Sequence, residues 1–367
     1  MTAPAPTATV LARAAAIQSD FASQLVQWQR SHGRSGLPWQ NTRDPYRVWL
    51  SEIMLQQTQV STVLGYYARF LERFPTVAAL AAATEDEVLG LWSGLGYYSR
   101  ARNLHRCAQG VVERFGGSFP AQAELLQTLP GIGRSTAAAI AAFCFGERVA
   151  ILDGNVKRVL SRVLAFGEDL SRSANEKALW QAAQCLLPAE GDSDAMARYT
   201  QGQMDLGATV CLPRRPQCLI CPVQRLCRAQ AAGEPERYPV RERRLRRSSL
   251  SLWLLQAQRP DGAVWLHKRP ARGIWAGLYG LPAFDSADEL QAALRPALRK
   301  VAQEQPAFLH VLTHKDLHLH PVRVPVTEDA EPVLQEGTDG AEGRWVPAHE
   351  WPTLGLPAPV RRLLEEG

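Results

Sequence analysis

Apolar and polar residues follow two different patterns along the chain. From about residue 21 to Cys227, apolar residues recur at helical spacing, with many alanines and short Gly/Pro breaks. Further on, Leu250–Gln256 and Leu317–Val326 are rich in β-forming residues, and Asp288–Val301 has the pattern of one helix. The chain is therefore predicted to be mainly α, with a helical domain over residues 21–227 and a smaller α/β domain over residues 249–367.

Two segments are expected to lie outside these domains. Residues 1–20 are rich in Ala, Pro and Thr and are predicted to form a disordered N-terminal tail. Residues 228–248 are predicted to be a basic linker, because Arg225–Arg247 contains eight arginines and three glutamates, an excess equal to the net charge of +5 of the whole chain. This stretch is either a solvated linker or a segment that follows a phosphate backbone, and both interpretations are compatible.

Composition narrows the class of protein. With 367 residues, of which 46% are hydrophobic and 21% charged, the chain has the makeup of a globular protein with two domains. The longest apolar run, Ala137–Phe145, is too short to cross a bilayer and is expected to be a buried helix. The N-terminal residues lack the basic start and long apolar core of a secretory signal. We therefore expect a cytoplasmic protein of bacterial type, monomeric and without a membrane partner.

Four of the seven cysteines form a tight cluster in the sequence. They follow a C-x6-C-x2-C-x5-C spacing and are Cys211, Cys218, Cys221 and Cys227. Soft thiolates this close together suit a tetrahedral zinc ion or an iron–sulfur cluster. Zinc sites usually pair their ligands in two short C-x2-4-C steps, whereas this run has only one, C-x2-C. The other three cysteines stand in apolar helical contexts and are expected to be core residues: Cys107, Cys144 and Cys185.

A glycine-containing turn has the features of an anion-binding hairpin. Gly131 and Gly133, within Leu129–Ala137, permit a tight turn. A helix expected to start at about Arg134 would add free N–H groups and a favourable dipole. A G-x-G turn by itself is usually a simple helix–helix connection, so the turn alone leaves both interpretations open.

Two carboxylic acids are candidates for chemistry at a sugar. Glu52 lies on a helix predicted to begin at Asp44–Pro45, among apolar neighbours that should raise its pKa. Asp153 precedes Gly154–Asn155, a context typical of a helix cap. A protonated acid beside an ionised carboxylate is the pair that glycosidic bond cleavage requires. The alternatives are a structurally paired glutamate and an ordinary capping aspartate.

Taken together, these segments resemble a known family. The cysteine spacing, Leu129–Ala137 and Asp153–Val159 are similar to the endonuclease III superfamily of helix-hairpin-helix DNA glycosylases with a "GPD" signature. Leu37–Gln40 and Pro45–Val60 resemble MutY-type adenine DNA glycosylases in particular. The resemblance spans nearly the whole chain. It implies a catalytic domain with a [4Fe–4S] cluster loop at residues 211–227, which acts on double-stranded DNA containing A:8-oxoguanine or A:G mispairs.

The resemblance also implies roles for single residues. Glu52 would protonate the adenine and then activate water, Asp153 would stabilise the sugar cation, and Trp39 would line the base pocket. Bifunctional relatives carry a strand-cleaving lysine where this chain has Ser135, and a hydroxyl cannot form an imine. A monofunctional glycosylase is therefore expected, with Lys157 as the alternative lysine for weak strand cleavage.

Other residues are assigned to DNA contact by the same resemblance. The hairpin glycines would hold backbone phosphate without reading sequence. Gln56 and Gln57 would enter the duplex near the lesion, and Tyr97 would intercalate, which helps to offset the cost of flipping a base. The alternative for Tyr97 is an ordinary surface aromatic.

The C-terminal domain resembles the Nudix-like domain of the MutY family on the residues Lys268–Pro282. Phe284–Lys300 lacks the glutamate-rich box with which a Nudix hydrolase holds magnesium, so we expect a domain that recognises 8-oxoguanine and does not hydrolyse nucleotides. Thr313 and His314 are expected to take the recognition role, in a loop two residues longer than the family pattern. A group of histidines is interpreted as a solvated strand face and not a metal site; it consists of His310, His314, His318 and His320.

Three alternatives remain from the sequence. An endonuclease III-type pyrimidine or thymine glycosylase is opposed by Ser135 and by the extra C-terminal domain. A non-catalytic iron–sulfur DNA-binding protein is opposed by the presence of both carboxyl groups. A Nudix nucleotide hydrolase is opposed by the absent glutamate box.

Overall fold

The computed structural model describes residues 6–189, 193–242, 247–327, 333–338, 340 and 342–366. The chain forms two compact units. The first comprises Met1–Val60, Thr76–Ala78 and Arg106–Arg244, and the second comprises Ser61–Pro75, Ala79–His105 and Leu245–Gly367. This division differs from the expected single boundary between residues 227 and 249, because most of residues 61–105 belong with the C-terminal part.

Specific polar contacts explain why this segment belongs to the second unit. The Asp86 carboxylate pairs with Lys268 Nζ at 2.6 Å, and Tyr98 Oη donates to the Leu356 carbonyl at 2.7 Å. These partners lie about 180 and 260 residues away, and a pattern of local periodicity contains no information about them.

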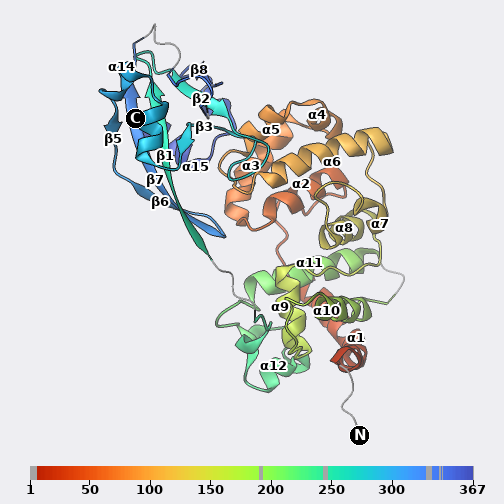
Figure 1. The fold of residues 1–367 in the computed structure, drawn as a ribbon. Coiled ribbons are helices and arrows are strands. Elements are labelled where there is room, and N and C mark those ends of the chain that lie inside the picture. The colour runs from red at the N-terminus through yellow and green to blue at the C-terminus, as the bar shows by residue number, and fades with distance from the viewer. Residues whose placement is uncertain are drawn as a thin grey trace. The chain divides into compact units, whose positions relative to one another are not determined.

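The first unit is helical (Figure 1). Its helices are α1 (Pro6–His32), α2 (Pro45–Leu55), α7 (Ala123–Leu126), α8 (Arg134–Ile140), α9 (Gly154–Val163), α10 (Ser173–Cys185), α11 (Ser193–Thr209) and α12 (Arg228–Ala231). A buried core joins α1, α8, α9, α10 and α11. The run predicted to be a buried helix, Ala137–Phe145, is α8 followed by one π-helical turn (Ala141–Phe145), and only its last residue is largely exposed.

The predicted N-terminal tail is wrong for residues 6–20, which form the first half of α1, while residues 1–5 lie outside the described residues. Val10 and Ala14 are fully buried, one helical turn apart, and continue the buried stripe of Phe21 and Leu25. This stripe packs against α10 and α11. The apolar spacing therefore outweighs the Ala/Pro/Thr-rich composition on which the tail was predicted.

The predicted linker is also partly structured. Residues 228–231 form α12, whose Ala229 is buried, and a 3-10 turn covers Pro235–Arg237. The predicted linker still contacts the rest of the first unit at Val240, whose carbonyl accepts a hydrogen bond from Leu170 N at 3.1 Å. The centre of the arginine-rich stretch, residues 243–246, lies outside the described residues.

The second unit is built on a mixed sheet. Its strands are β1 (Ser248–Gln258), β2 (Val264–Lys268), β3 (Tyr279–Gly280), β4 (Ala283–Phe284), β5 (Gln303–Glu304), β6 (Phe308–Val311), β7 (Lys315–Pro325) and β8 (Arg344–Val346). In the described residues the order is β3-β2-β1-β7-β5, with β4 on β1, β6 on β7 and β8 on β2. β1 and β7 run parallel over eleven residue pairs, which confirms both strands predicted from sequence.

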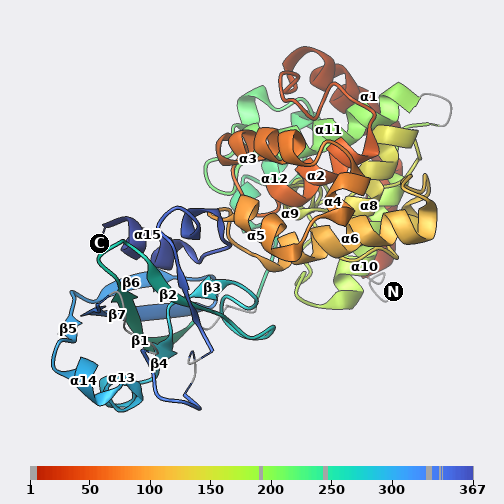
Figure 2. The ribbon, with the colours of Figure 1, turned by 90° about the horizontal axis from the view of Figure 1, so that it is seen from above.

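Helices cover both faces of this sheet. Side chains of β1 alternate between two cores: Leu255 and Ala257 face one, and Leu252 and Leu254 face the other. Figure 2 shows α13 (Ala287–Ala293) and α14 (Pro296–Arg299) on one side and α15 (Ala358–Glu366) on the other. The single helix expected over Asp288–Val301 is wrong, because the two residues before Pro296 are extended, as the proline ring requires of its predecessor.

The remaining helices are α3 (Val60–Arg73), α4 (Val77–Ala82), α5 (Glu85–Trp92) and α6 (Ser99–Phe115). α3 and α5 lie in the second unit, and α6 begins in the second unit and ends in the first. Among the described residues, none of the helices is both long and apolar enough to span a bilayer.

Candidate active site

Helix α2 places Glu52 in a cavity of the first unit, about 1290 Å³ in volume. The helix begins as predicted: the Asp44 side chain accepts from Tyr46 N at 2.9 Å and Pro45 occupies the first turn. Trp49 and Ile53 are buried on either side of Glu52, whose carboxyl lines the cavity. The cavity exceeds the roughly 300–1,000 Å³ typical of small-molecule pockets, so it can admit a nucleotide.

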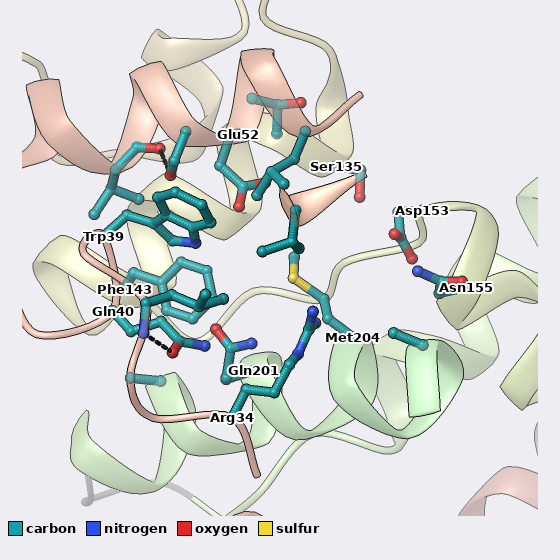
Figure 3. A pocket seen from close by; sticks show the side chains of 18 of the residues that line it. Arg34, Trp39, Gln40, Glu52, Ser135, Phe143, Asp153, Asn155, Gln201 and Met204 are labelled. Atoms are coloured by element: carbon teal, nitrogen blue, oxygen red, sulfur yellow. Dashed lines mark hydrogen bonds between the residues drawn. The ribbon is translucent and has the colours of Figure 1, made fainter. Parts of the chain in front are cut away.

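Asp153 lines the same cavity from the start of α9. Its Oδ1 accepts from Val156 N at 2.7 Å, so the carboxylate does cap the helix. The same carboxylate lines the cavity, and Figure 3 shows Ser135 between Glu52 and Asp153 on the cavity wall. From the sequence, a helix cap and a catalytic carboxylate were alternative interpretations of Asp153. In the structure the carboxylate caps α9 and also lines the cavity, so the two interpretations do not exclude each other.

The two carboxyl groups have different electrostatic surroundings. Burial, and secondarily the negative charge of Asp153, raise the pKa of Glu52 to about 8. Burial also raises the pKa of Asp153, but here N–H groups of Val156 and Asn155 and the charges of Arg158 and Lys157 act in the opposite direction. Glu52 is therefore the group that holds a proton at neutral pH, and Asp153 is the group with partners for its negative charge.

The raised pKa of Glu52 predicts a pH dependence of stability. The folded state keeps this proton up to about pH 8, whereas an unfolded glutamate releases it near pH 4.5. Stability from this site is therefore complete below pH 4.5 and is lost as the pH rises toward 8. Because each pKa unit corresponds to about 1.4 kcal/mol, Glu52→Gln should unfold with a free energy about 2–4 kcal/mol higher than wild type at pH 8.5.

Urea unfolding followed by circular dichroism at pH 5 and pH 8.5 measures this difference. The advantage of the variant should shrink toward zero at pH 5. An equal difference at both values, or a variant less stable at pH 8.5, would contradict the protonated state assigned to Glu52.

Ser135 and Lys157 have different positions. Ser135 lines the cavity, and its Oγ accepts from Leu152 N at 3.1 Å, which fixes the backbone just before Asp153. Lys157 is not among the lining residues: its Nζ pairs with Glu176 at 2.5 Å on α10. The structure therefore does not bring Lys157 to the cavity, and its effect on the site is the electrostatic one on Asp153.

The cavity is also lined by side chains that the sequence motifs did not single out. Trp39, which was predicted, is joined by Phe143 and Met204 as apolar walls (Figure 3). Besides Glu52, Ser135 and Asp153, the polar side chains labelled in Figure 3 are Arg34, Gln40, Asn155 and Gln201. Asn155 directly follows the Asp153–Gly154 pair and could have been inferred from that motif. Gln201 and Met204 lie on α11, remote in sequence from every motif.

The end of α2 and the hairpin provide the candidate DNA contacts of this unit. Gln56 and Gln57 both line the cavity, and Gln57 has a left-handed backbone with φ of 57°, a conformation that a non-glycine residue adopts at a cost. The hairpin turns at Gly131, where φ is 76°, and α8 begins after Gly133, as predicted. The hairpin glycines do not line the cavity, consistent with a role toward the DNA backbone.

The second unit brings together two candidates that are 216 residues apart. Tyr97 Oη and Thr313 Oγ1 are hydrogen-bonded at 2.9 Å. Tyr97 is 44% exposed and has a left-handed backbone, with φ of 49°. Thr313 and His314 are exposed in the turn between β6 and β7. On β7, His318 alternates with the buried Leu317 and Leu319.

The four clustered cysteines line one small cavity, which residues of α9 such as Val159 and Arg162 also line. Arg162, almost fully buried, donates to Cys211 Sγ at 3.3 Å and to the Leu212 carbonyl. Burial raises the pKa of Cys221 to about 12, and the neighbouring thiols of Cys211, Cys227 and Cys218 act in the same direction. In the part of the chain that the structure describes, no group of three or more His, Cys, Asp or Glu side chains is arranged to hold a metal ion. The donor set, four soft sulfurs lining one apolar cavity, suits a zinc ion or an iron–sulfur group.

The other cysteines only partly follow the prediction. Cys107 and Cys144 are buried, as expected for core residues. Cys185 is exposed at the last position of α10, so the core prediction is wrong for this cysteine.

Comparison with known proteins places this site in a class. Residues 50–185 match the family described as HhH-GPD superfamily base excision DNA repair protein, and residues 253–366 match the NUDIX domain. The chain is similar over 58% of its length to a solved structure of a thermostable thymine-DNA glycosylase, with 29% identity, a TM-score of 0.52 and 96% of that chain covered. Fold and site together define a base-excision DNA glycosylase of the helix-hairpin-helix class.

Relatives of known function define the family more narrowly. The chain is 34% identical to the adenine DNA glycosylase of Buchnera aphidicola (subsp. Acyrthosiphon pisum), over 94% of this chain and 97% of that protein. It is 47% identical to the adenine DNA glycosylase of Homo sapiens, over 59% of this chain and 40% of that protein. The chain belongs to the adenine DNA glycosylase family, which confirms the resemblance seen in the sequence.

Proposed function

We propose that the protein releases adenine from double-stranded DNA at A:8-oxoguanine and A:G mispairs. The observation that carries the proposal is a pair of carboxyl groups that line one cavity. The pKa of Glu52 is raised to about 8, and Asp153 has neighbouring N–H groups and positive charges that stabilise its negative charge. Family membership supports adenine as the base. We further propose that the protein acts as a monomer on DNA in a bacterial cytoplasm.

The reaction follows from the two protonation states. Glu52 donates its proton to N7 of the flipped adenine, and the electron pair of the breaking C1′–N9 bond stays on the base. Asp153 stabilises the positive charge that develops at C1′, through space or through a transient bond to carbon. Glu52, now a carboxylate, accepts a proton from the water that attacks C1′. The products are free adenine and an abasic site, and the acid is regenerated.

Strand cleavage is not part of this proposal. Ser135 has a hydroxyl where an imine-forming lysine would be needed, and Lys157 is engaged with Glu176. A primary amine that is ion-paired and outside the cavity lining is a poor nucleophile toward C1′. The enzyme is therefore proposed to be monofunctional.

We propose that Cys211, Cys218, Cys221 and Cys227 hold a [4Fe–4S] cluster. When bound, the cluster supplies the positive charge that keeps four neighbouring thiolates ionised. Arg162 would then fix the ligand Cys211 by its hydrogen bond to the sulfur and by its bond to the next carbonyl. The chain's own contribution is to attach the loop of residues 211–227 to α9.

DNA contact is proposed for residues of both units. Gln56, Gln57 and the hairpin at Gly131 serve the first unit. In the second, the Tyr97–Thr313 pair and His314 are proposed to read the 8-oxoguanine strand, supported by their exposure. Hydrolysis of nucleotides by the Nudix-like domain is not proposed. Residues 284–300 contain few acidic side chains, and one of them, Glu289, accepts from Asp285 N near the start of α13, so it is already engaged in a hydrogen bond within the chain.

Excision assays on four matched duplexes test the proposal. They contain adenine opposite 8-oxoguanine, guanine or thymine, and thymine opposite guanine, and each is analysed with and without hot alkali and with borohydride trapping. Adenine release from the first two duplexes, with breaks only after alkali and no trapped adduct, is the expected result. Thymine release would favour the pyrimidine-glycosylase alternative, and breaks without alkali together with a trapped adduct would overturn monofunctionality.

A further inference from the structure

The arginine-rich stretch ends in an arginine that has a partner inside the chain. Arg247, the last of its eight arginines, directly precedes β1, and β1 begins beside the turn between β6 and β7, with Ser248 paired to Lys315 (Figure 1). Arg247 donates to both carboxylate oxygens of Asp316, by Nε at 3.4 Å and by Nη2. The same Nη2 donates to the Leu312 carbonyl at 2.8 Å. One guanidinium therefore holds both ends of this turn.

Thr313 and His314, the two central residues of the turn, are unusual for a turn of this length. Leu312 N donates to Lys315 O at 2.8 Å, which closes a two-residue hairpin loop. Such loops favour glycine, asparagine or aspartate, because turns with left-handed residues match the twist of the two strands. Neither Thr313 nor His314 has a positive φ, so this loop is of the kind that splays the strands. The turn therefore depends on contacts from outside the hairpin.

Three contacts from outside the hairpin hold this turn. Ser248 N donates to the His314 carbonyl at 3.1 Å, and Tyr97 Oη is hydrogen-bonded to Thr313 Oγ1 at 2.9 Å. The third is the guanidinium of Arg247, which binds the first carbonyl of the turn, the group that accepts from the fourth residue in a closed β-turn. Of these three contacts, the one from Arg247 spans the turn from end to end.

The pair of Arg247 and Asp316 is better suited to fix geometry than to stabilise the fold. Their side chains are 39% and 30% exposed, and ion pairs this exposed contribute little to stability. A guanidinium presents a rigid fork of N–H groups, which matches two carboxylate oxygens in a way that a flexible ammonium cannot. Hydrogen bonding from Arg247 also lowers the pKa of Asp316, which keeps the carboxylate ionised. The contact can therefore be broken without unfolding the protein.

We propose that Arg247 and Asp316 are positioning residues for the recognition turn: their contact holds Thr313 and His314 in the arrangement that distinguishes 8-oxoguanine from guanine opposite adenine. The inference rests on the proposed function, in which this turn reads the 8-oxoguanine strand. It assigns one arginine of the basic stretch to a partner within the protein instead of a phosphate group. Because neither side chain lines the cavity that contains Glu52, breaking the contact should change discrimination and not the chemical step.

Variants that break the contact but keep either the charge or the shape test the proposal. Arg247→Lys retains the positive charge and loses the fork that binds a carbonyl and two carboxylate oxygens together. Asp316→Asn retains the shape and loses the negative charge. The matched control is Arg241→Lys, the same change at an exposed arginine of the same stretch. Adenine release is measured in single turnover, with enzyme below saturation, from duplexes with adenine opposite 8-oxoguanine and opposite guanine.

The ratio of the first rate to the second should fall at least about fivefold in Arg247→Lys and in Asp316→Asn, because each loses a hydrogen bond between charged groups. Release opposite guanine should stay within about twofold of wild type, whereas a merely structural role would slow both duplexes alike. The double variant should have the ratio of Arg247→Lys alone, because both substitutions remove the same contact. Arg241→Lys should leave both rates unchanged. A ratio within about twofold of wild type in both single variants would overturn the inference.

Hydrogen–deuterium exchange of the free protein tests the contact without a substrate. Exchange in residues 308–316 should be at least about fivefold faster in Arg247→Lys than in wild type, and unchanged in Arg241→Lys. Unchanged exchange in Arg247→Lys would overturn the positioning role. A wild type that releases no adenine from either duplex would overturn the proposed function instead, and the exchange result would then decide whether the contact fixes the turn.

Discussion

Glu52→Gln is expected to lower the rate of adenine release at least about 10³-fold while duplex binding stays within about threefold of wild type. The amide has nearly the same shape as the acid but carries no proton that can be transferred to the base, and general acid catalysis contributes about 10²–10⁴-fold. Glu52 also activates the water in the proposed reaction, so one substitution removes two steps. The proton is present because burial and Asp153 raise the pKa of this group to about 8.

Single-turnover kinetics on an A:8-oxoguanine duplex, with fluorescence anisotropy for binding, separates the two effects. Glu113→Gln, an exposed glutamate on α6, is the matched control and should release adenine at the wild-type rate. If Glu52→Gln retains more than a tenth of wild-type activity, Glu52 is a structural glutamate and not the acid.

Asp153→Asn should reduce adenine release by a similar factor, about 10³-fold or more, without loss of stability. Asparagine caps helices about as well as aspartate, so the bond from Val156 N is retained. What it cannot supply is the negative charge at C1′, and stabilisation of developing charge is usually the largest contribution to catalysis. The substitution therefore removes the proposed chemistry and keeps the cap.

Asp44→Asn provides the control, because Asp44 caps α2 in the same way, with a bond from Tyr46 N, and does not line the cavity. Both variants should unfold within about 1 kcal/mol of wild type, and only Asp153→Asn should be inactive. Near wild-type excision by Asp153→Asn would contradict the catalytic role and leave Asp153 with a helix-capping role only.

Local signals in the sequence identified the parts of the site that depend on local structure. The cap and proline at Asp44–Pro45 and the turn at Gly131–Gly133 begin helices where the structure has them. Glu52 was expected to have a raised pKa from its apolar neighbours, and it does. Such features are determined by residues within one or two helical turns, so a pattern of spacing is sufficient to find them.

Long-range contacts could not be inferred in the same way. The Arg34–Asp205 pair joins residues 171 positions apart, and only the packing of α11 brings Gln201 to the cavity. The assignment of α3 and α5 to the C-terminal unit likewise depends on partners such as Lys268 and Leu356. The tail prediction is wrong for a different reason: composition does not contain the spacing of Val10 and Ala14, which places both on the buried face of α1.

The central claim is that the acid at position 52 and the anion at position 153 act on one flipped nucleotide. The most direct measurement is a crystal structure of Asp153→Asn bound to a duplex with adenine opposite 8-oxoguanine. The expected result is an extrahelical adenine in the cavity, with N7 within hydrogen-bond distance of the Glu52 carboxyl and C1′ facing residue 153. An adenine bound elsewhere, or side chains 52 and 153 that contact different nucleotides, would contradict the account.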